Sequence, residues 1–149
     1  MAALIGILIV TGKTPASDIS AMNHTNIEAI HIHPHLSIVS DGKPMTVPQN
    51  IGISSSLHKD HSLDKYVGSS MQGMAPLHTH TADGIIHVES GVKRNYTLGE
   101  FLDIWGNKEF ISSNKIIKMS IDGKPIDTGF RDHILRDGEK IKLEVSNAS

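Results

Sequence analysis

The sequence predicts an α+β domain in which one short helix packs on a mostly antiparallel sheet of hairpins. Two observations carry this prediction. Asp-Gly pairs, which are strong signals for tight hairpin turns, stand between strand-like apolar stretches at 41–42, 83–84 and 122–123. Residues 97–106 combine a helix start signal with apolar residues at helical spacing.

Length and composition limit the range of functions. The 149 residues suffice for one ordinary domain, and the 38% apolar fraction allows a core. The 14 basic and 16 acidic residues give no sign of the basic surface that a nucleic-acid partner requires. The chain has no cysteine, which excludes disulfides, thiolate nucleophiles and iron–sulfur clusters. Nine of its ten histidines fall between His24 and His87, so the function depends on what these histidines do.

The N-terminus divides into an apolar segment, residues 1–12, and a polar linker, residues 13–26, ahead of a single His-rich domain, residues 27–149. The apolar run is shorter than the roughly 20 residues that span a bilayer. It is therefore the trimmed end of a membrane anchor, a buried strand, or a segment covered by another subunit in a homo-oligomer. Together with three Asn-x-Ser/Thr sequons, it favours an extracytoplasmic protein, secreted or membrane-anchored.

The first half of the domain is expected to contain two hairpins separated by a loop. Residues 27–39 are predicted to form a strand that turns at Asp41-Gly42 and returns over 45–47. Residues 50–72 show no periodicity and are expected to be a long loop. The second hairpin covers 76–89 and turns at its own Asp-Gly pair.

A helix and further strands follow. Thr97 is the expected N-cap, Glu100 completes a capping box and Gly106 ends the helix. Its apolar side chains share one face, which is predicted to pack in the core. Strands are expected at 116–121 and 140–145.

Two resemblances add to this prediction. Residues 132–143, DHILRDGEKIKL, resemble the closing loop and last strand of β-grasp, ubiquitin-like domains, and the order of hairpin, helix and strands is similar. The resemblance implies a β-grasp-like sheet; because the terminal Gly-Gly of carrier members is missing, it implies no carrier activity. The motifs HIHPH, LHTH and GIIH also resemble an uncharacterised group of small His-rich exported proteins of archaea and bacteria. That resemblance implies a location and no mechanism.

The histidines of the second hairpin are expected to converge on one of its faces. With the Asp-Gly pair as the two central turn residues, His80 faces His87 across the hairpin. His78 then faces Glu89. Alternate residues of a strand point to the same side, and directly opposed residues have Cβ atoms about 4.5–5.5 Å apart. These four side chains are therefore predicted metal ligands.

A second set of ligands comes from the first strand. His31, His33 and His35 alternate along it and are expected on one side, although Pro34 indicates an edge or a bulge there. Imidazole nitrogens bind zinc, copper, iron and nickel, and the predicted cofactor is copper or zinc. The predicted metal ligands are His78, His80, His87, His31, His33, His35 and Glu89.

The function assigned to these ligands is transition-metal binding, with alternatives left open. One is an enzyme in which three imidazoles hold an ion that activates water, as in carbonic anhydrases. Another is an assembly subunit cross-linked by metal, and a third is a pH-sensitive histidine cluster that needs no metal. Two further histidines, His58 and His61, are expected in a solvated loop. Met71 and Met74 are either soft Cu(I) ligands or packing residues.

Overall fold

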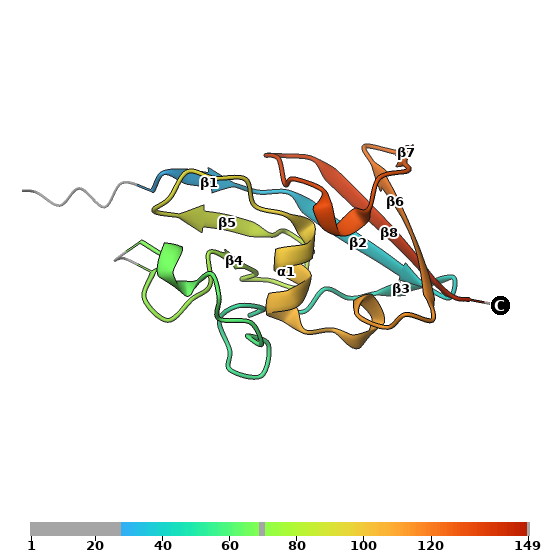
Figure 1. Cartoon of the computed structure of the whole chain (residues 1–149), viewed down its shortest axis with the longest axis horizontal. Helices are drawn as coiled ribbons and strands as arrows, with labels where there is room; N and C mark the ends of the chain where they lie inside the picture. The colour runs from blue at the N-terminus through green and yellow to red at the C-terminus, as the bar shows by residue number, and fades with distance from the viewer. Residues whose placement is uncertain (1–27, 69–70, 149) are drawn as a thin grey trace, which may run out of the picture.

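The computed structural model describes residues 28–68 and 71–148 as an α+β fold with one α-helix and two mostly antiparallel sheets. A three-stranded sheet lies at one end of the molecule and a five-stranded sheet at the other, with the helix α1 near their junction (Figure 1). The apolar segment 1–12 and the linker 13–26 lie outside the described residues, so the interpretations of the N-terminus remain predictions. None of the helices in the described part of the chain is long and apolar enough to cross a bilayer.

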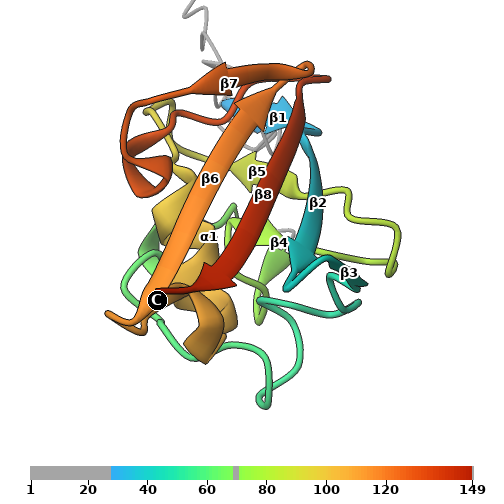
Figure 2. The same ribbon diagram turned by 90° about the vertical axis from the view of Figure 1, so that its right-hand side faces the viewer.

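The five-stranded sheet has the order β3-β2-β8-β6-β7. Its strands are β2 (His35–Ser40), β3 (Lys43–Met45), β6 (Lys115–Ile121), β7 (Lys124–Ile126) and β8 (Lys140–Asn147). The central strands β2 and β8 run parallel, and the other pairs are antiparallel. The hairpins β2–β3 and β6–β7 thus flank the central strand β8, with β6, β8 and β2 side by side (Figure 2). This arrangement is β-grasp-like and confirms the predicted fold class, and it includes strands from both halves of the chain.

Both turns within this sheet follow the predicted Asp-Gly chemistry. Asp41 and Gly42 connect β2 to β3 with φ of 48° and 78°, and Asp122 and Gly123 connect β6 to β7 with 49° and 79°. Tight hairpins with two positive φ angles favour these residue types. The repeated Asp-Gly-Lys-Pro tetrapeptide therefore uses one turn geometry twice.

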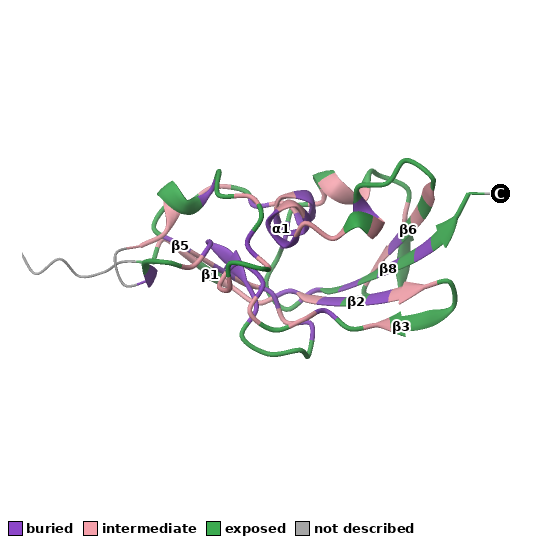
Figure 3. Ribbon diagram, turned by 90° about the horizontal axis from the view of Figure 1, so that it is seen from below, coloured by how far each residue is buried: buried purple, intermediate pink, exposed green. Residues whose placement is uncertain are grey.

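Helix α1 (Leu98–Trp105) confirms the sequence prediction closely. The Thr97 side chain accepts a hydrogen bond from the Glu100 backbone, while the Glu100 carboxylate accepts one from the Thr97 backbone. Gly106 ends the helix with φ of 69°. The predicted apolar face is buried in one core with residues of both sheets. Figure 3 shows α1 largely in purple, the colour of buried residues.

The three-stranded sheet has the order β1-β5-β4, formed by β1 (Ile30–Ile32), β5 (His87–Ser90) and β4 (Leu77–His78). The prediction of one continuous strand over 27–39 was wrong. The chain breaks at His33-Pro34, so that β1 belongs to this sheet and β2 to the other. Proline cannot donate a ladder hydrogen bond, which accounts for a break at this position.

The second predicted hairpin exists, but its register and turn were predicted incorrectly. His78 pairs with His87, where the sequence analysis had placed Glu89. Residues 79–86 form a longer connection: the Gly84 carbonyl accepts a hydrogen bond from the Leu36 backbone, and the Ile86 backbone donates to Pro34. Residues 84–86 therefore form backbone hydrogen bonds with Pro34 and Leu36, at the junction of β1 and β2. These hydrogen bonds replace those of the tight hairpin.

Candidate metal centre

Six of the seven predicted ligands lie on one face of the three-stranded sheet. Cross-strand pairing places His31 opposite Glu89 and His78 opposite His87. Continuing the β1–β5 register by one pair sets His33 beside His87, and their ring centroids are 4.7 Å apart. We call this set the His–Glu cluster; it consists of His31, His33, His78, His80, His87 and Glu89.

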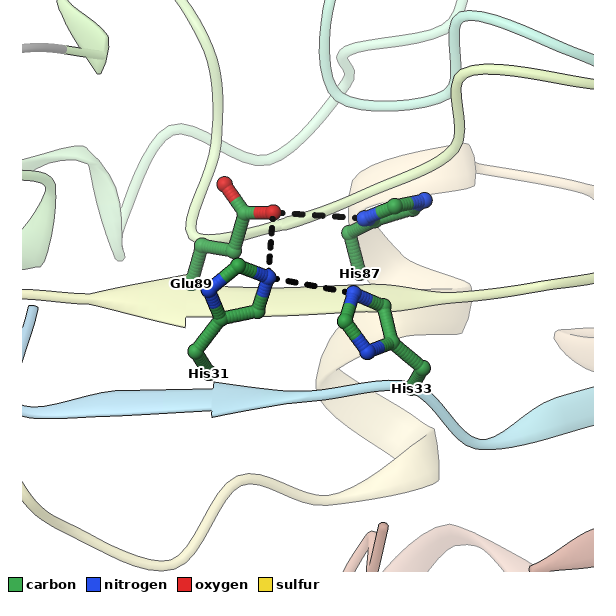
Figure 4. Close-up of side chains that lie close together, drawn as sticks. All are labelled: His31, His33, His87 and Glu89. Atoms are coloured by element: carbon green, nitrogen blue, oxygen red, sulfur yellow. Dashed lines mark hydrogen bonds and ion pairs between the residues drawn. The ribbon is translucent and has the colours of Figure 1, made fainter. Parts of the chain in front are cut away.

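The first group within the cluster joins β1 to β5 (Figure 4). Nε2 of His31 lies 3.1 Å from Nε2 of His33 and 3.1 Å from Oε1 of Glu89. The same carboxylate oxygen is 3.2 Å from Nδ1 of His87. One candidate ligand atom from each of these four residues lies within 4.8 Å of the others, which is close enough for a shared ion.

The second group joins β4 to β5 and has two residues in common with the first. Nε2 of His78 lies 3.2 Å from Nε2 of His80 and 3.9 Å from Oε2 of Glu89. The His80 and His87 rings meet edge to face with centroids 4.6 Å apart. Candidate ligand atoms of these four residues also lie within 4.8 Å of one another. The two groups therefore share His87 and Glu89.

The spacing of the ring nitrogens matches that of two ligands on one metal ion. Nitrogens about 2.0–2.1 Å from a tetrahedral zinc ion are roughly 3.3 Å apart, close to the 3.1 and 3.2 Å separations in the two histidine pairs. Nδ1 of His78 donates to the Ala75 carbonyl oxygen at 2.9 Å, so Nε2 keeps its lone pair. Nδ1 of His31 lies 2.7 Å from a Glu28 oxygen in the equivalent arrangement. Such partners orient metal-binding imidazoles.

The environment keeps the central imidazoles neutral. His78 is fully buried, and this burial lowers its pKa to about 4, although the Ala75 carbonyl and Glu89 act in the opposite direction. Burial also lowers the pKa of His87, against the raising effect of its hydrogen bond with Glu89. Metal binding requires neutral imidazole, so both side chains are in the binding form at neutral pH.

Loop contacts hold the backbone on both sides of the cluster. The buried Thr79 side chain donates to the Pro48 carbonyl at 2.8 Å and accepts from the Ile51 backbone at 3.0 Å, which fixes the chain between the second histidine pair. The His33 backbone donates to Oδ1 of Asp137 at 2.9 Å. Residues from the loop before β8 therefore help to position a candidate ligand of the other sheet.

The seventh predicted ligand, His35, lies elsewhere. It is the first residue of β2, beside Gly84, and belongs to neither of the two groups that share His87 and Glu89. The break at His33-Pro34 separates it from β1, which carries His31 and is followed directly by His33. The structure thus does not bring the three histidines of the HIHPH motif together.

A third group combines Asp64 with His58 and His61, the two histidines expected in a solvated loop. Nε2 of His58 lies 3.0 Å from one Asp64 oxygen, and Nδ1 of His61 lies 2.8 Å from the other. The group lines a cavity of about 560 Å³, to which Met74 also contributes. Residues 58–63 form no helix or strand, so no periodic pattern in the sequence indicates that these three side chains meet.

No family model, no curated protein and no solved structure matches the chain.

Proposed function

We propose that this protein binds a transition-metal ion, copper or zinc, through the His–Glu cluster. The observation that carries the proposal is the 3.2 Å separation of Nε2 in His78 and His80, with the proton of the buried His78 committed to Ala75. In the His80 tautomer that carries its proton on Nδ1, the two Nε2 lone pairs face each other and a cation between them accepts both. A carboxylate completes each group, which supplies a negative charge to a divalent ion.

The donor set supports copper or zinc over harder cations. Imidazole predominates and one carboxylate is present, whereas calcium and magnesium prefer sites made of oxygen ligands. A ligand set without thiolate resists oxidation, which suits the extracytoplasmic location proposed from the apolar N-terminal segment and the sequons. In that location the protein would store or deliver the ion.

The experiment is metal analysis of the full chain purified without added metal, and again after chelation and reloading with zinc or copper. We expect bound metal in the wild type and at least a tenfold loss of affinity in His80→Ala, whose exposed side chain makes misfolding a minor concern. His35→Ala is the matched control, because this histidine lies outside both groups, and it should bind as the wild type does. Equal affinity in the wild type, in His80→Ala and in His31→Ala/His33→Ala would overturn the proposal.

Water activation by the bound ion is a second candidate function. His80 and His31 are exposed while His78 is fully buried, an arrangement that leaves one side of each group open to solvent. Zinc held by imidazoles lowers the pKa of bound water to about 7. The test is the rate of ester hydrolysis and of carbon dioxide hydration by zinc-loaded and chelated protein. Equal rates would eliminate this candidate and leave metal binding in place.

A further inference from the structure

We propose that the His–Glu cluster is a dinuclear centre in which Glu89 bridges two metal ions. The inference depends on the proposed function, because it concerns the same cluster. It goes beyond metal binding because it assigns the number of ions, the ligands that bind only one of the ions, and the residue that bridges them.

The carboxylate of Glu89 presents a different oxygen to each group. Oε1 faces His31 at 3.1 Å and His87 at 3.2 Å, whereas Oε2 lies on the side of His78, at 3.9 Å. A carboxylate whose two oxygens face different ligand groups is arranged to bridge two ions. Ions in two-metal sites are about 3.5–4 Å apart, a distance that a bridging carboxylate spans.

A single ion cannot use the whole cluster. Ligand atoms about 2.0–2.2 Å from one ion lie within roughly 4.4 Å of one another. Within the described part of the chain, no group inside a 4.8 Å limit unites the His31–His33 pair with the His78–His80 pair. The two pairs belong to β1 and to the β4 side, with β5 between them. Each pair therefore needs an ion of its own.

The shared His87 makes the two positions unequal. Its ring lies between the pairs, with its centroid 4.7 Å from that of His33 and 4.6 Å from that of His80. A neutral imidazole that donates one proton has one lone pair, so it serves one ion. The other ion then has two imidazoles, the bridging carboxylate and solvent as ligands. We expect two equivalents to bind in two steps of different affinity.

The test is the stoichiometry of zinc on the full chain, measured by titration against a competing chelator. The wild type should take two equivalents. His31→Ala/His33→Ala and His80→Ala should each lose one equivalent and keep the other, because each change removes ligands from one group. His61→Ala, in the third group, is the control and should keep two. Circular dichroism of each variant identifies any that fail to fold, in which case His31→Ala alone replaces the double variant.

Copper(II) supplies a second readout that does not depend on counting. After one equivalent, electron paramagnetic resonance should show an isolated copper signal. The second equivalent should broaden or diminish that signal, because two copper ions about 4 Å apart couple magnetically. A signal that simply doubles would place the second ion elsewhere and overturn the dinuclear centre.

The remaining outcomes separate this inference from the proposed function. No bound equivalent in the wild type would overturn the proposed function and this inference together. One equivalent would overturn the dinuclear centre and leave metal binding intact. Two equivalents with one lost in His61→Ala would assign the second ion to the His58–His61–Asp64 group, and would also overturn the inference.

Discussion

Nε2 of His31 lies 3.1 Å from Oε1 of Glu89, directly across the antiparallel pair of β1 and β5. This contact is the link between the edge strand β1 and the carboxylate that both ligand groups share. A strand of three residues has few backbone hydrogen bonds of its own. Its attachment to the sheet is therefore expected to depend on the metal.

Removal of metal should loosen β1 selectively. Without an ion, the neighbouring nitrogens of His31 and His33 are joined by one N–H···N hydrogen bond in place of two metal–ligand bonds. Amide hydrogen exchange in Ile30–Ile32 should accelerate after chelation, while exchange in the central strand β8 should change little. Hydrogen-exchange mass spectrometry measures both segments in one sample. Equal acceleration in the two strands would indicate a global loss of stability instead.

Replacing Glu28 should weaken metal binding although it belongs to neither ligand group. Its carboxylate lies 2.7 Å from Nδ1 of His31 and orients the ring so that Nε2 faces the ligand group. Loss of such a partner typically lowers metal affinity by about 10–100-fold. We expect a reduction of this size in Glu28→Gln, measured by chelator competition. Glu144→Gln removes an exposed carboxylate that pairs with Lys142 and is the matched control; an equal effect there would contradict this explanation.

The stability of the metal-free protein should fall between pH 6.5 and 4. The pKa of His78 is lowered to about 4 in the folded state, mainly by burial, whereas 6.5 is its ordinary value in an unfolded chain. In this window the unfolded chain binds a proton that the folded chain does not, so the free energy of unfolding decreases as the pH falls. The free energy of unfolding is therefore about 3 kcal/mol higher above pH 6.5 than below pH 4 as a result of this one histidine. Urea denaturation of chelated protein at several pH values measures it, with His78→Gln expected to show a flatter dependence.

Gly84→Ala should be more destabilising than Gly123→Ala. Both glycines have positive φ, of 87° and 79°, so both substitutions strain the backbone, by about 1 kcal/mol. A Cβ at Gly84 would also clash with the Leu36 carbonyl oxygen, while one at Gly123 meets nothing within 4 Å. We expect the first variant to lose at least about 1 kcal/mol more, since the backbone must shift. Thermal denaturation of the pair isolates the close approach, and equal losses would show that it is relaxed at no cost.

Much of the fold followed from local signals. The capping residues Thr97 and Glu100 and the turns at Asp41-Gly42 and Asp122-Gly123 form as predicted, because their geometry is determined by residues adjacent in sequence. The partners of the Asp83-Gly84 segment could not be predicted in this way. They lie near Pro34, far away in the sequence, and compete with the expected hairpin.

The candidate site was predicted better than the hairpin that carries it. The true register differs from the expected one by two residues, as the pairing of His78 with His87 shows. Side chains alternate with a period of two along a strand, so this difference changes the partners and preserves the face. The position of His35 was predicted incorrectly for a different reason, because side chains alternate between the two faces only within one unbroken strand. The meeting of both pairs at Glu89 depends on the order of three strands, which no local pattern specifies.

The bond from the His33 backbone to Asp137 has a consequence for transplanting this centre into other proteins. The acceptor is more than a hundred positions downstream and belongs to the β-grasp-like half of the molecule. A synthetic peptide or a grafted hairpin carrying all five imidazoles would lack the hydrogen bond from His33 to Asp137. The backbone at His33 would then no longer be held in place beside the other ligands. Affinity for the ion is in this sense a property of the entire fold, and engineering it elsewhere would require the scaffold as well as the ligands.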